Sequence, residues 1–192
     1  MDIREVLGKR RIFLDGGTGT SLQKMGLKAG ERPETWNLLH PERIEALHRA
    51  YLDAGADVIY TNTFGANRLK YPADGEFELE DIVKSAVDIA KRAQIACGRE
   101  GDSWVALDIG PSGKLLKPLG DLDFEDAVSL FAEVVRCGAA AGADLVVVET
   151  MGDSYELKAA VLAAKENSEL PVIATAAFDE RARLLTGGTP EA

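Results

Sequence analysis

Short, almost wholly apolar runs alternate with long stretches of helical periodicity, and this alternation constrains the fold more than any other feature of the sequence. The runs are rich in β-branched residues, as expected for strands that are buried on both faces of a sheet. Strands are predicted at 12–14, 58–60, 104–107, 145–148 and 172–174. Helices are predicted at 41–54, 79–97, 124–141 and 153–165. This order predicts right-handed βαβ units and a parallel sheet.

One joint between a helix and the next strand occurs twice, because residues 54–61 are similar to residues 141–148. In both copies a helix ends at a glycine, and a small residue, an aspartate and a buried strand follow. A repeated joint favours a repeating βα architecture, although doubly wound sheets also use it.

The length and the strand count predict an incomplete barrel. A complete (β/α)₈ barrel has eight strands and about 250 residues, whereas this chain has 192 residues and five predicted strands. Thr189, Pro190 and Glu191 have the pattern of a helix start at the end of the chain. We therefore expect an α/β fold in which residues 1–192 form a single incomplete TIM-type barrel domain of about five βα units.

Charge and composition exclude several classes of protein. The formal net charge is −10, and the short basic clusters do not form the basic face that nucleic-acid binding requires. No apolar run approaches the roughly 20 residues of a membrane span, and no signal peptide is recognisable, so a cytoplasmic protein is expected. Cys97 and Cys137 lie in helical stretches without a partner at metal-ligand spacing, which favours buried thiols over a disulfide or a zinc site.

Polar side chains follow four of the predicted strands. They are Asp15, Asn62 with Thr63, Asp108 and Glu149. Because sites in α/β folds lie at the carboxyl ends of the strands, these residues are expected at one rim. Asp15 and Glu149 together could bind an ammonium group, hold a metal or act as an acid/base pair. Either carboxylate alone could instead cap a helix or pair with an arginine.

The glycine-rich turn at 16–20 does not carry a nucleotide-binding motif. Leu22 occupies the position of the third glycine of the dinucleotide fingerprint, and Leu115 follows Gly113 and Lys114 where a Walker motif needs serine or threonine. The backbone N–H groups of the turn could still bind a carboxylate.

Five ordered blocks of residues resemble the homocysteine S-methyltransferase family. They are 15–20, 61–67, 108–113 with 118–120, 149–160, and 178–180 with 185–187. The block at 61–65 and the Pro118-Leu119-Gly120 block are most similar to the N-terminal, homocysteine-binding module of cobalamin-dependent methionine synthases.

The resemblance implies a zinc-containing barrel that S-methylates homocysteine to methionine, with methylcobalamin as the donor. Zinc would bind the substrate sulfur as a thiolate, which is needed because a free thiol is a poor nucleophile at neutral pH. Asp15 and Glu149 correspond to the acids that hold the substrate amino group. The implied substrate-binding set is Asp15, Gly16, Gly17, Thr18, Asn62, Thr63, Asp108 and Glu149.

The chain departs from the family in its metal ligands. The family binds zinc through three cysteines on later strands, and Cys97 and Cys137 do not match those positions. We therefore expect no metal ligand within this chain, ligands beyond Ala192, and no methyl transfer by the chain alone.

Partners are expected for such a module. A corrinoid domain or a chain that completes the barrel would supply what is missing, and open parallel edges favour self-association. One alternative is a non-catalytic or split barrel half that needs a partner chain for the zinc cysteines. Another is an unrelated lyase or glycosidase barrel that uses Asp15 and Glu149 as an acid/base pair without zinc.

Overall fold

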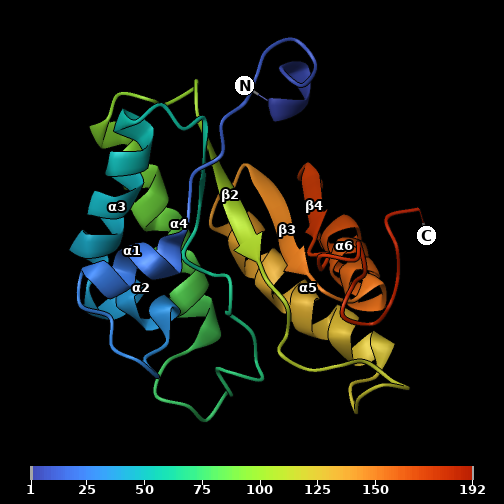
Figure 1. The fold of residues 1–192 in the computed structure, drawn as a ribbon. Helices are drawn as coiled ribbons and strands as arrows, with labels where there is room; N and C mark the ends of the chain where they lie inside the picture. The colour runs from blue at the N-terminus through green and yellow to red at the C-terminus, as the bar shows by residue number, and fades with distance from the viewer. Residues whose placement is uncertain (1, 192) are drawn as a thin grey trace.

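A computed structural model describes residues 2–191 of the chain. Its centre is a four-stranded parallel sheet in the order β1-β2-β3-β4, so strands adjacent in the sequence are neighbours in space (Figure 1). The strands are β1 (Val58–Tyr60), β2 (Trp104–Ile109), β3 (Leu145–Met151) and β4 (Val172–Ala176). The predicted parallel α/β arrangement is confirmed.

Four long helices alternate with these strands. They are α3 (Pro41–Asp53), α4 (Leu79–Ala96), α5 (Phe124–Ala140) and α6 (Ser154–Asn167). Their bounds differ from the predicted ones by at most two residues. Four short elements precede β1 and were not predicted: η1 (Ile3–Glu5), α1 (Thr18–Lys24), η2 (Pro33–Thr35) and α2 (Trp36–Leu39). Within the described residues, no helix is long and apolar enough to cross a membrane.

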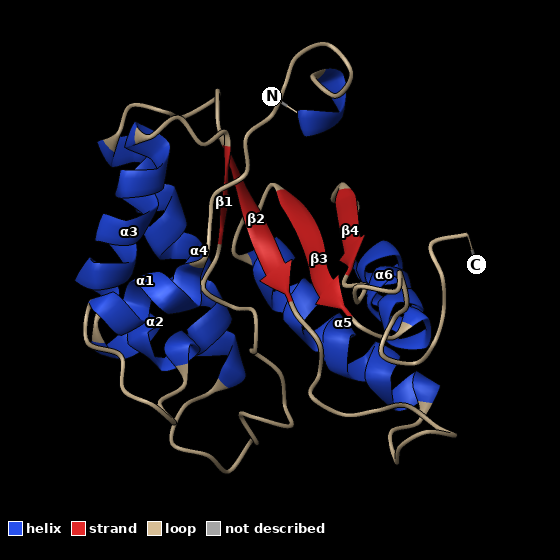
Figure 2. Ribbon diagram, in the orientation of Figure 1, coloured by secondary structure: helices blue, strands red, loops and turns tan. Residues whose placement is uncertain are grey.

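The sheet is apolar on both faces, which explains the uninterrupted apolar runs of its strands. One face packs against the long helices, as Figure 2 shows, and successive residues of a strand point to opposite faces. In β2, Val105 and Leu107 belong to the core shared with the helices, whereas Trp104 and Ala106 belong to a second cluster. Ile3 of η1 packs into that second cluster. The N-terminal segment therefore covers part of the face opposite the helices.

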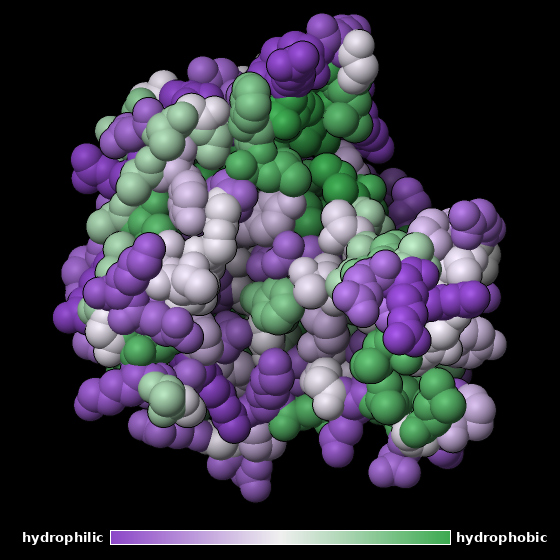
Figure 3. Space-filling view, viewed as in Figure 1, coloured by the Kyte–Doolittle hydropathy of each residue, from purple (hydrophilic) through white to green (hydrophobic). Residues whose placement is uncertain are grey.

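Both lateral edges of the sheet differ from the sequence prediction. Residues 12–14 do not form a regular strand, because only Leu14 makes a parallel bridge, to Val58. Phe13 is 59% exposed, and an apolar surface surrounds the N-terminal segment in Figure 3. β4 is half-buried to exposed along its length, so it is not buried on both faces as predicted. The reason is the same at both edges: each segment pairs with a sheet neighbour on one side only.

The predicted helix start at 189–191 is not observed in the described part of the chain. Thr189 to Glu191 are turn or irregular backbone, and Ala192 lies outside the described residues.

The repeated joint has one structural explanation in both copies. Gly55 and Gly142 have φ values of +98° and +94°, which a residue with a Cβ rarely adopts. The aspartate two residues later then turns back to the preceding segment of the sheet. Asp57 accepts a hydrogen bond from the Phe13 N–H at 2.8 Å, and Asp144 accepts one from the Val105 N–H at 2.7 Å. Each aspartate therefore fastens two neighbouring segments together.

Candidate functional site

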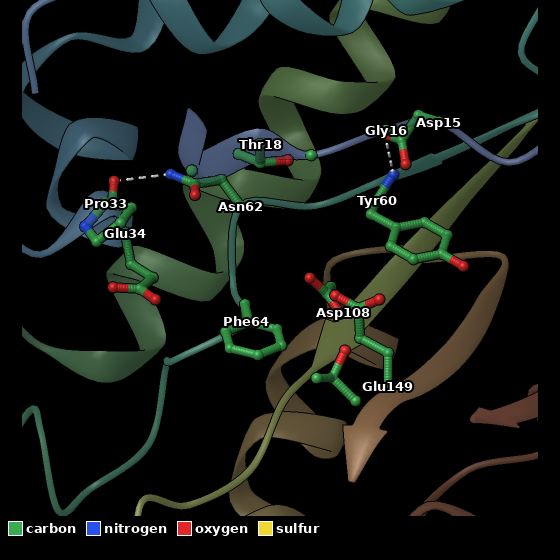
Figure 4. Close-up of a pocket in the computed structure, with 13 residues that line it drawn as sticks. Asp15, Gly16, Thr18, Pro33, Glu34, Tyr60, Asn62, Phe64, Asp108 and Glu149 are labelled. Carbon is green, nitrogen blue, oxygen red and sulfur yellow. Dashed lines mark hydrogen bonds between the residues drawn. The ribbon is translucent and has the colours of Figure 1, made fainter. Parts of the chain in front are cut away.

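A cavity of about 500 Å³ lies at the carboxyl ends of the strands (Figure 4). It brings together seven of the eight residues that the resemblance implies for substrate binding. These are Asp15, Gly16, Gly17, Thr18, Asn62, Asp108 and Glu149. The remaining lining residues are Gly19, Pro33, Glu34, Tyr60, Phe64 and Thr150. Residues from five separate parts of the chain thus meet, and all but the η2 residues Pro33 and Glu34 do so because parallel segments of the sheet end at the same edge.

Thr63 does not line this cavity and instead lies beneath it. Its hydroxyl donates to the Asp108 carbonyl at 2.7 Å and lies 2.7 Å from the Thr61 hydroxyl. The Thr61 hydroxyl also accepts the Asp108 N–H at 3.1 Å. The two threonines therefore hold the backbone of Asp108, and Thr63 acts on the cavity through that residue.

Asp15 is anchored at the end of the first irregular segment. Its carboxylate accepts the Tyr60 N–H at 2.8 Å, and its own N–H donates to the Val58 carbonyl at 3.0 Å. Burial, with a smaller contribution from the charge of Glu149, raises the pKa of Asp15 from 3.8 to about 7, although the Tyr60 hydrogen bond opposes both effects.

Asp108 is the most deeply buried of the three strand-end carboxyls. Only 6% of the residue is exposed, and its Oδ1 atom has no hydrogen-bond partner among the described residues. Burial raises the pKa of Asp108 well above its ordinary value, and the charges of Glu149, Asp15 and Glu34 add to this effect. An isolated carboxylate in such a place is costly, which favours the neutral acid.

Glu149 owes its position to an irregularity in β3. The strand was predicted to end at Val148, but it continues to Met151 with a shift in its pairing to β4 between these two residues. Thr150 has a φ of 58°, and its N–H donates to the Thr175 hydroxyl at 3.1 Å. The Glu149 side chain lies in the cavity beside Asp108 (Figure 4), and burial raises the pKa of Glu149.

The glycine-rich segment is the start of α1 rather than an open turn. Gly17 caps the helix and Thr18 is its first residue. A Cβ at Gly16 would lie 3.0 Å from the Tyr51 hydroxyl oxygen, which donates to the Gly17 carbonyl at 3.4 Å. Glycine at position 16 therefore allows the chain to pass close to α3 while it forms the cavity wall.

Several lining residues escaped the sequence analysis. Tyr60 and Phe64 directly flank the predicted polar block at 61–63, so the strand-end rule could have found them. Glu34 lies on the short η2, for which the sequence has no periodic signal. It is buried and accepts hydrogen bonds from the Gly65 N–H at 2.7 Å and the Tyr71 hydroxyl at 2.9 Å.

The residues present do not fit a thiolate-bound zinc. Within residues 2–191, no group of three or more His, Cys, Asp or Glu side chains is arranged to hold a metal ion. Cys97 and Cys137 are free thiols that do not line the cavity. Among the residues that line the cavity there are four acids and no lysine, arginine or histidine. The cavity is therefore suited to a cationic group.

Comparison with known proteins identifies the family. Residues 12–192 match the sequence model of the homocysteine S-methyltransferase family. The chain belongs to this family. The resemblance seen in the sequence blocks is thereby confirmed, and the interpretation as an unrelated lyase or glycosidase barrel is set aside.

Two relatives of this chain are methionine synthases from mycobacteria. The chain is 32% identical to that of Mycobacterium leprae over 178 residues, covering 85% of this chain and 14% of the relative. It is 29% identical to that of Mycobacterium tuberculosis over 205 residues, covering 97% of this chain and 17% of the relative. The chain therefore spans less than a fifth of the length of these relatives.

Solved structures of a homocysteine methyltransferase, MmuM from Escherichia coli, have a similar fold. The oxidized form matches with a TM-score of 0.84 at 23% identity, covering 97% of this chain and 69% of that chain. The metallated form matches with a TM-score of 0.77 at 25% identity, covering 98% and 70%. The predicted fold class, a partial TIM-barrel-like α/β arrangement, is confirmed.

Proposed function

We propose that this chain is the homocysteine-binding part of a methyltransferase that converts homocysteine into methionine. The observation that carries the proposal is the cavity at which three strand-end carboxyls converge and which no lysine, arginine or histidine of the described residues lines. An amino acid carries one ammonium group, and charge-assisted hydrogen bonds to carboxylates are the strongest way to hold it.

Each lining group has a role in this proposal. Asp15 and Glu149 hold the substrate ammonium, and Gly16, Gly17 and Thr18 lie against the amino acid. Asn62 fixes the opposite wall, because its amide donates to the Pro33 carbonyl at 2.8 Å and to the Asn37 Oδ1 at 2.9 Å. Phe64 offers an apolar surface for the methylene groups of the side chain.

The chemistry at sulfur belongs to other parts of the protein in this proposal. Zinc would supply an activated thiolate, and its cysteine ligands would lie outside residues 1–192. We assign methylcobalamin as the methyl donor, carried by a corrinoid domain of the same polypeptide or of a partner. The methionine synthases that resemble this chain are several times longer, which leaves room for such domains. A cytoplasmic location fits this role.

A second candidate is a split barrel half that needs another chain. The two one-sided edges of the sheet favour it, since the 12–14 segment and β4 each have an unpaired side that further strands could cover. The two proposals differ in where the zinc cysteines lie, on the same polypeptide or on a partner.

Calorimetric titration of the chain with L-homocysteine tests the proposal. The matched ligand is 4-mercaptobutanoate, which lacks only the amino group, and we expect it not to bind. Replacing Asp15 by Asn or Glu149 by Gln removes a charge-assisted contact of about 1.5–3 kcal/mol, so affinity should fall roughly 10- to 100-fold. Asp74→Asn, at an exposed acid remote from the cavity, should bind as the parent does. Equal binding of both ligands, or no loss in the two cavity variants, would contradict the proposal.

A further inference from the structure

The cavity has an excess of acidic groups over what one amino acid can neutralise. Asp15, Glu34, Asp108 and Glu149 line it, and no cationic side chain of the described residues does. Glu34 is already held by the Gly65 N–H and the Tyr71 hydroxyl. Three carboxyls therefore remain for a ligand that brings a single positive charge. Carboxyl groups packed together in this way cannot all be ionised at once.

The hydrogen bonds distinguish which carboxyl carries a proton. Asp15 accepts the Tyr60 N–H, which stabilises its anion. Asp108 is 94% buried, and its Oδ1 has no partner among the described residues while the residue lines the cavity. A buried oxygen without a donor favours the neutral acid. The proton therefore belongs on Asp108, which lacks the hydrogen bond that Asp15 accepts and is more deeply buried than Glu149.

We propose that Asp108 holds a proton in the ligand-free protein and releases it when the substrate ammonium enters, so that the site exchanges one proton for one amino group. This inference rests on the proposed function and adds Asp108 to the groups that recognise the substrate. The O–H bond of the acid breaks and the proton passes to solvent. The resulting carboxylate then accepts hydrogen bonds from the ammonium, and no electron transfer or further reactant is needed.

The charged groups around Asp108 all raise its pKa. Glu149 on β3, Asp15 after the first segment and Glu34 on η2 raise the pKa of Asp108, in addition to the larger effect of burial. The Tyr60 phenol on β1 is neutral, because burial and the charges of nearby acids, Glu149 the largest among them, raise its pKa. A cation placed among these groups reverses the local charge and lowers the pKa of the acid. Linkage then requires that binding releases a proton and tightens as the pH rises towards that pKa.

Titration calorimetry in two buffers of different ionisation enthalpy measures the exchange. The probe is L-norleucine, which has the amino and carboxylate groups but no thiol, so any released proton comes from the protein. We expect release of about one proton per bound ligand at about pH 8, where Asp15 with its pKa of about 7 is mostly ionised, and an affinity that rises up to about tenfold per pH unit below the pKa of Asp108. Asp108→Asn should bind the ligand with almost no proton release, whereas Asp74→Asn, at an exposed acid that does not line the cavity, should release the proton as the parent does.

Infrared difference spectroscopy of the unmodified chain gives a second readout that does not depend on any variant folding. Addition of L-norleucine should remove the C=O band of a neutral carboxylic acid. Binding without proton release and without loss of this band overturns the inference and leaves the proposed function intact. Unchanged release from Asp108→Asn also overturns it, because another group would then carry the proton. Failure of both L-norleucine and L-homocysteine to bind at any pH contradicts the proposed function, and the inference with it.

Discussion

Replacing Asp57 or Asp144 by alanine should cost similar stability but have different effects on ligand binding. Asp57 fastens the irregular segment that carries Asp15, since it accepts the Phe13 N–H at 2.8 Å and pairs with Arg10 at 2.9 Å. That segment makes only one bridge to the sheet. We therefore expect Asp57→Ala to release the segment, displace Asp15 and weaken amino acid binding.

Asp144 makes equivalent contacts, but the strand that it fastens, β2, is also paired with a strand on each side. It accepts the Val105 N–H at 2.7 Å and pairs with Lys91 at 2.7 Å. β2 is paired on both sides, to β1 and to β3, so its register does not depend on this aspartate. Asp144→Ala should therefore leave the carboxyl end of β2, and the Asp108 side chain there, in place.

The magnitude follows from the hydrogen bond and the ion pairs that each substitution removes, which for Asp57 include a longer pair with Arg99 at 3.9 Å. A hydrogen bond to an ionised carboxylate contributes about 1.5–3 kcal/mol, and a partly exposed ion pair adds roughly 0.2–1 kcal/mol. Each substitution should thus lower the free energy of unfolding by about 2–4 kcal/mol, or the melting temperature by roughly 2–4 °C for each kcal/mol.

Urea denaturation followed by tryptophan fluorescence measures this stability, and calorimetry with L-norleucine measures binding under native conditions. Asp57→Asn is the matched control, because it keeps an oxygen acceptor for the Phe13 N–H and should recover part of the loss. The reasoning is refuted if Asp57→Ala costs less than about 1 kcal/mol. It is equally refuted if Asp144→Ala weakens binding as much as Asp57→Ala does.

Four further substitutions test other features of the structure. Gly110→Ala would bring a Cβ within 2.5 Å of the Phe64 ring, so we expect a loss of about 1–3 kcal/mol in urea denaturation and weaker ligand binding; Gly19→Ala, which meets no atom within 4 Å, should stabilise α1 by up to about 1 kcal/mol. Asp15 has a pKa raised from 3.8 to about 7, so the folded state binds more protons than the unfolded one and stability falls as the pH rises through this window; thermal melts of Asp15→Asn should lack this contribution. His48 is buried with both ring nitrogens unpaired among the described residues and a pKa lowered from 6.5 to about 4, so it removes stability as the pH falls through that window, and His48→Leu should be more stable at pH about 5 than at neutral pH relative to the parent. An unchanged pH profile in either titration variant would contradict the assignment.

The strands and long helices were predictable because burial imposes the sequence pattern directly. In β2, Val105 and Leu107 face the helices while Trp104 and Ala106 face the second cluster, so these four positions must be apolar. The two edge segments of the sheet were harder to predict. Residues 12–14 and 172–174 have the same apolar pattern as the central strands, yet they have a sheet neighbour on one side only, and the number of neighbours is not encoded locally.

The residues of the candidate site that follow strands could be predicted from the sequence, whereas those that reach the site through tertiary contacts could not. Asp15, Asp108 and Glu149 follow apolar runs, and the rule that sites form at the carboxyl ends of strands brings them together. Thr63 also follows a strand, but its side chain lies beneath the cavity, because its hydroxyl donates a hydrogen bond to the Asp108 carbonyl. Glu34 comes from an irregular segment, and only the folded chain reveals that it reaches the same cavity.

The arrangement separates recognition of the amino acid from activation of its sulfur. Asp15, Asp108 and Glu149 stand at the carboxyl ends of three segments of one sheet and line the same cavity. That closeness makes the ligand-free site electrostatically unfavourable unless a proton is shared, and a substrate ammonium relieves the repulsion without any metal. Under the proposed function, these residues would select α-amino acids by charge, and selection for the thiol would come from the zinc ligands outside residues 1–192. Binding of L-norleucine and of L-homocysteine to residues 1–192 should therefore be alike, and the preference for homocysteine should arise only where the zinc cysteines are present.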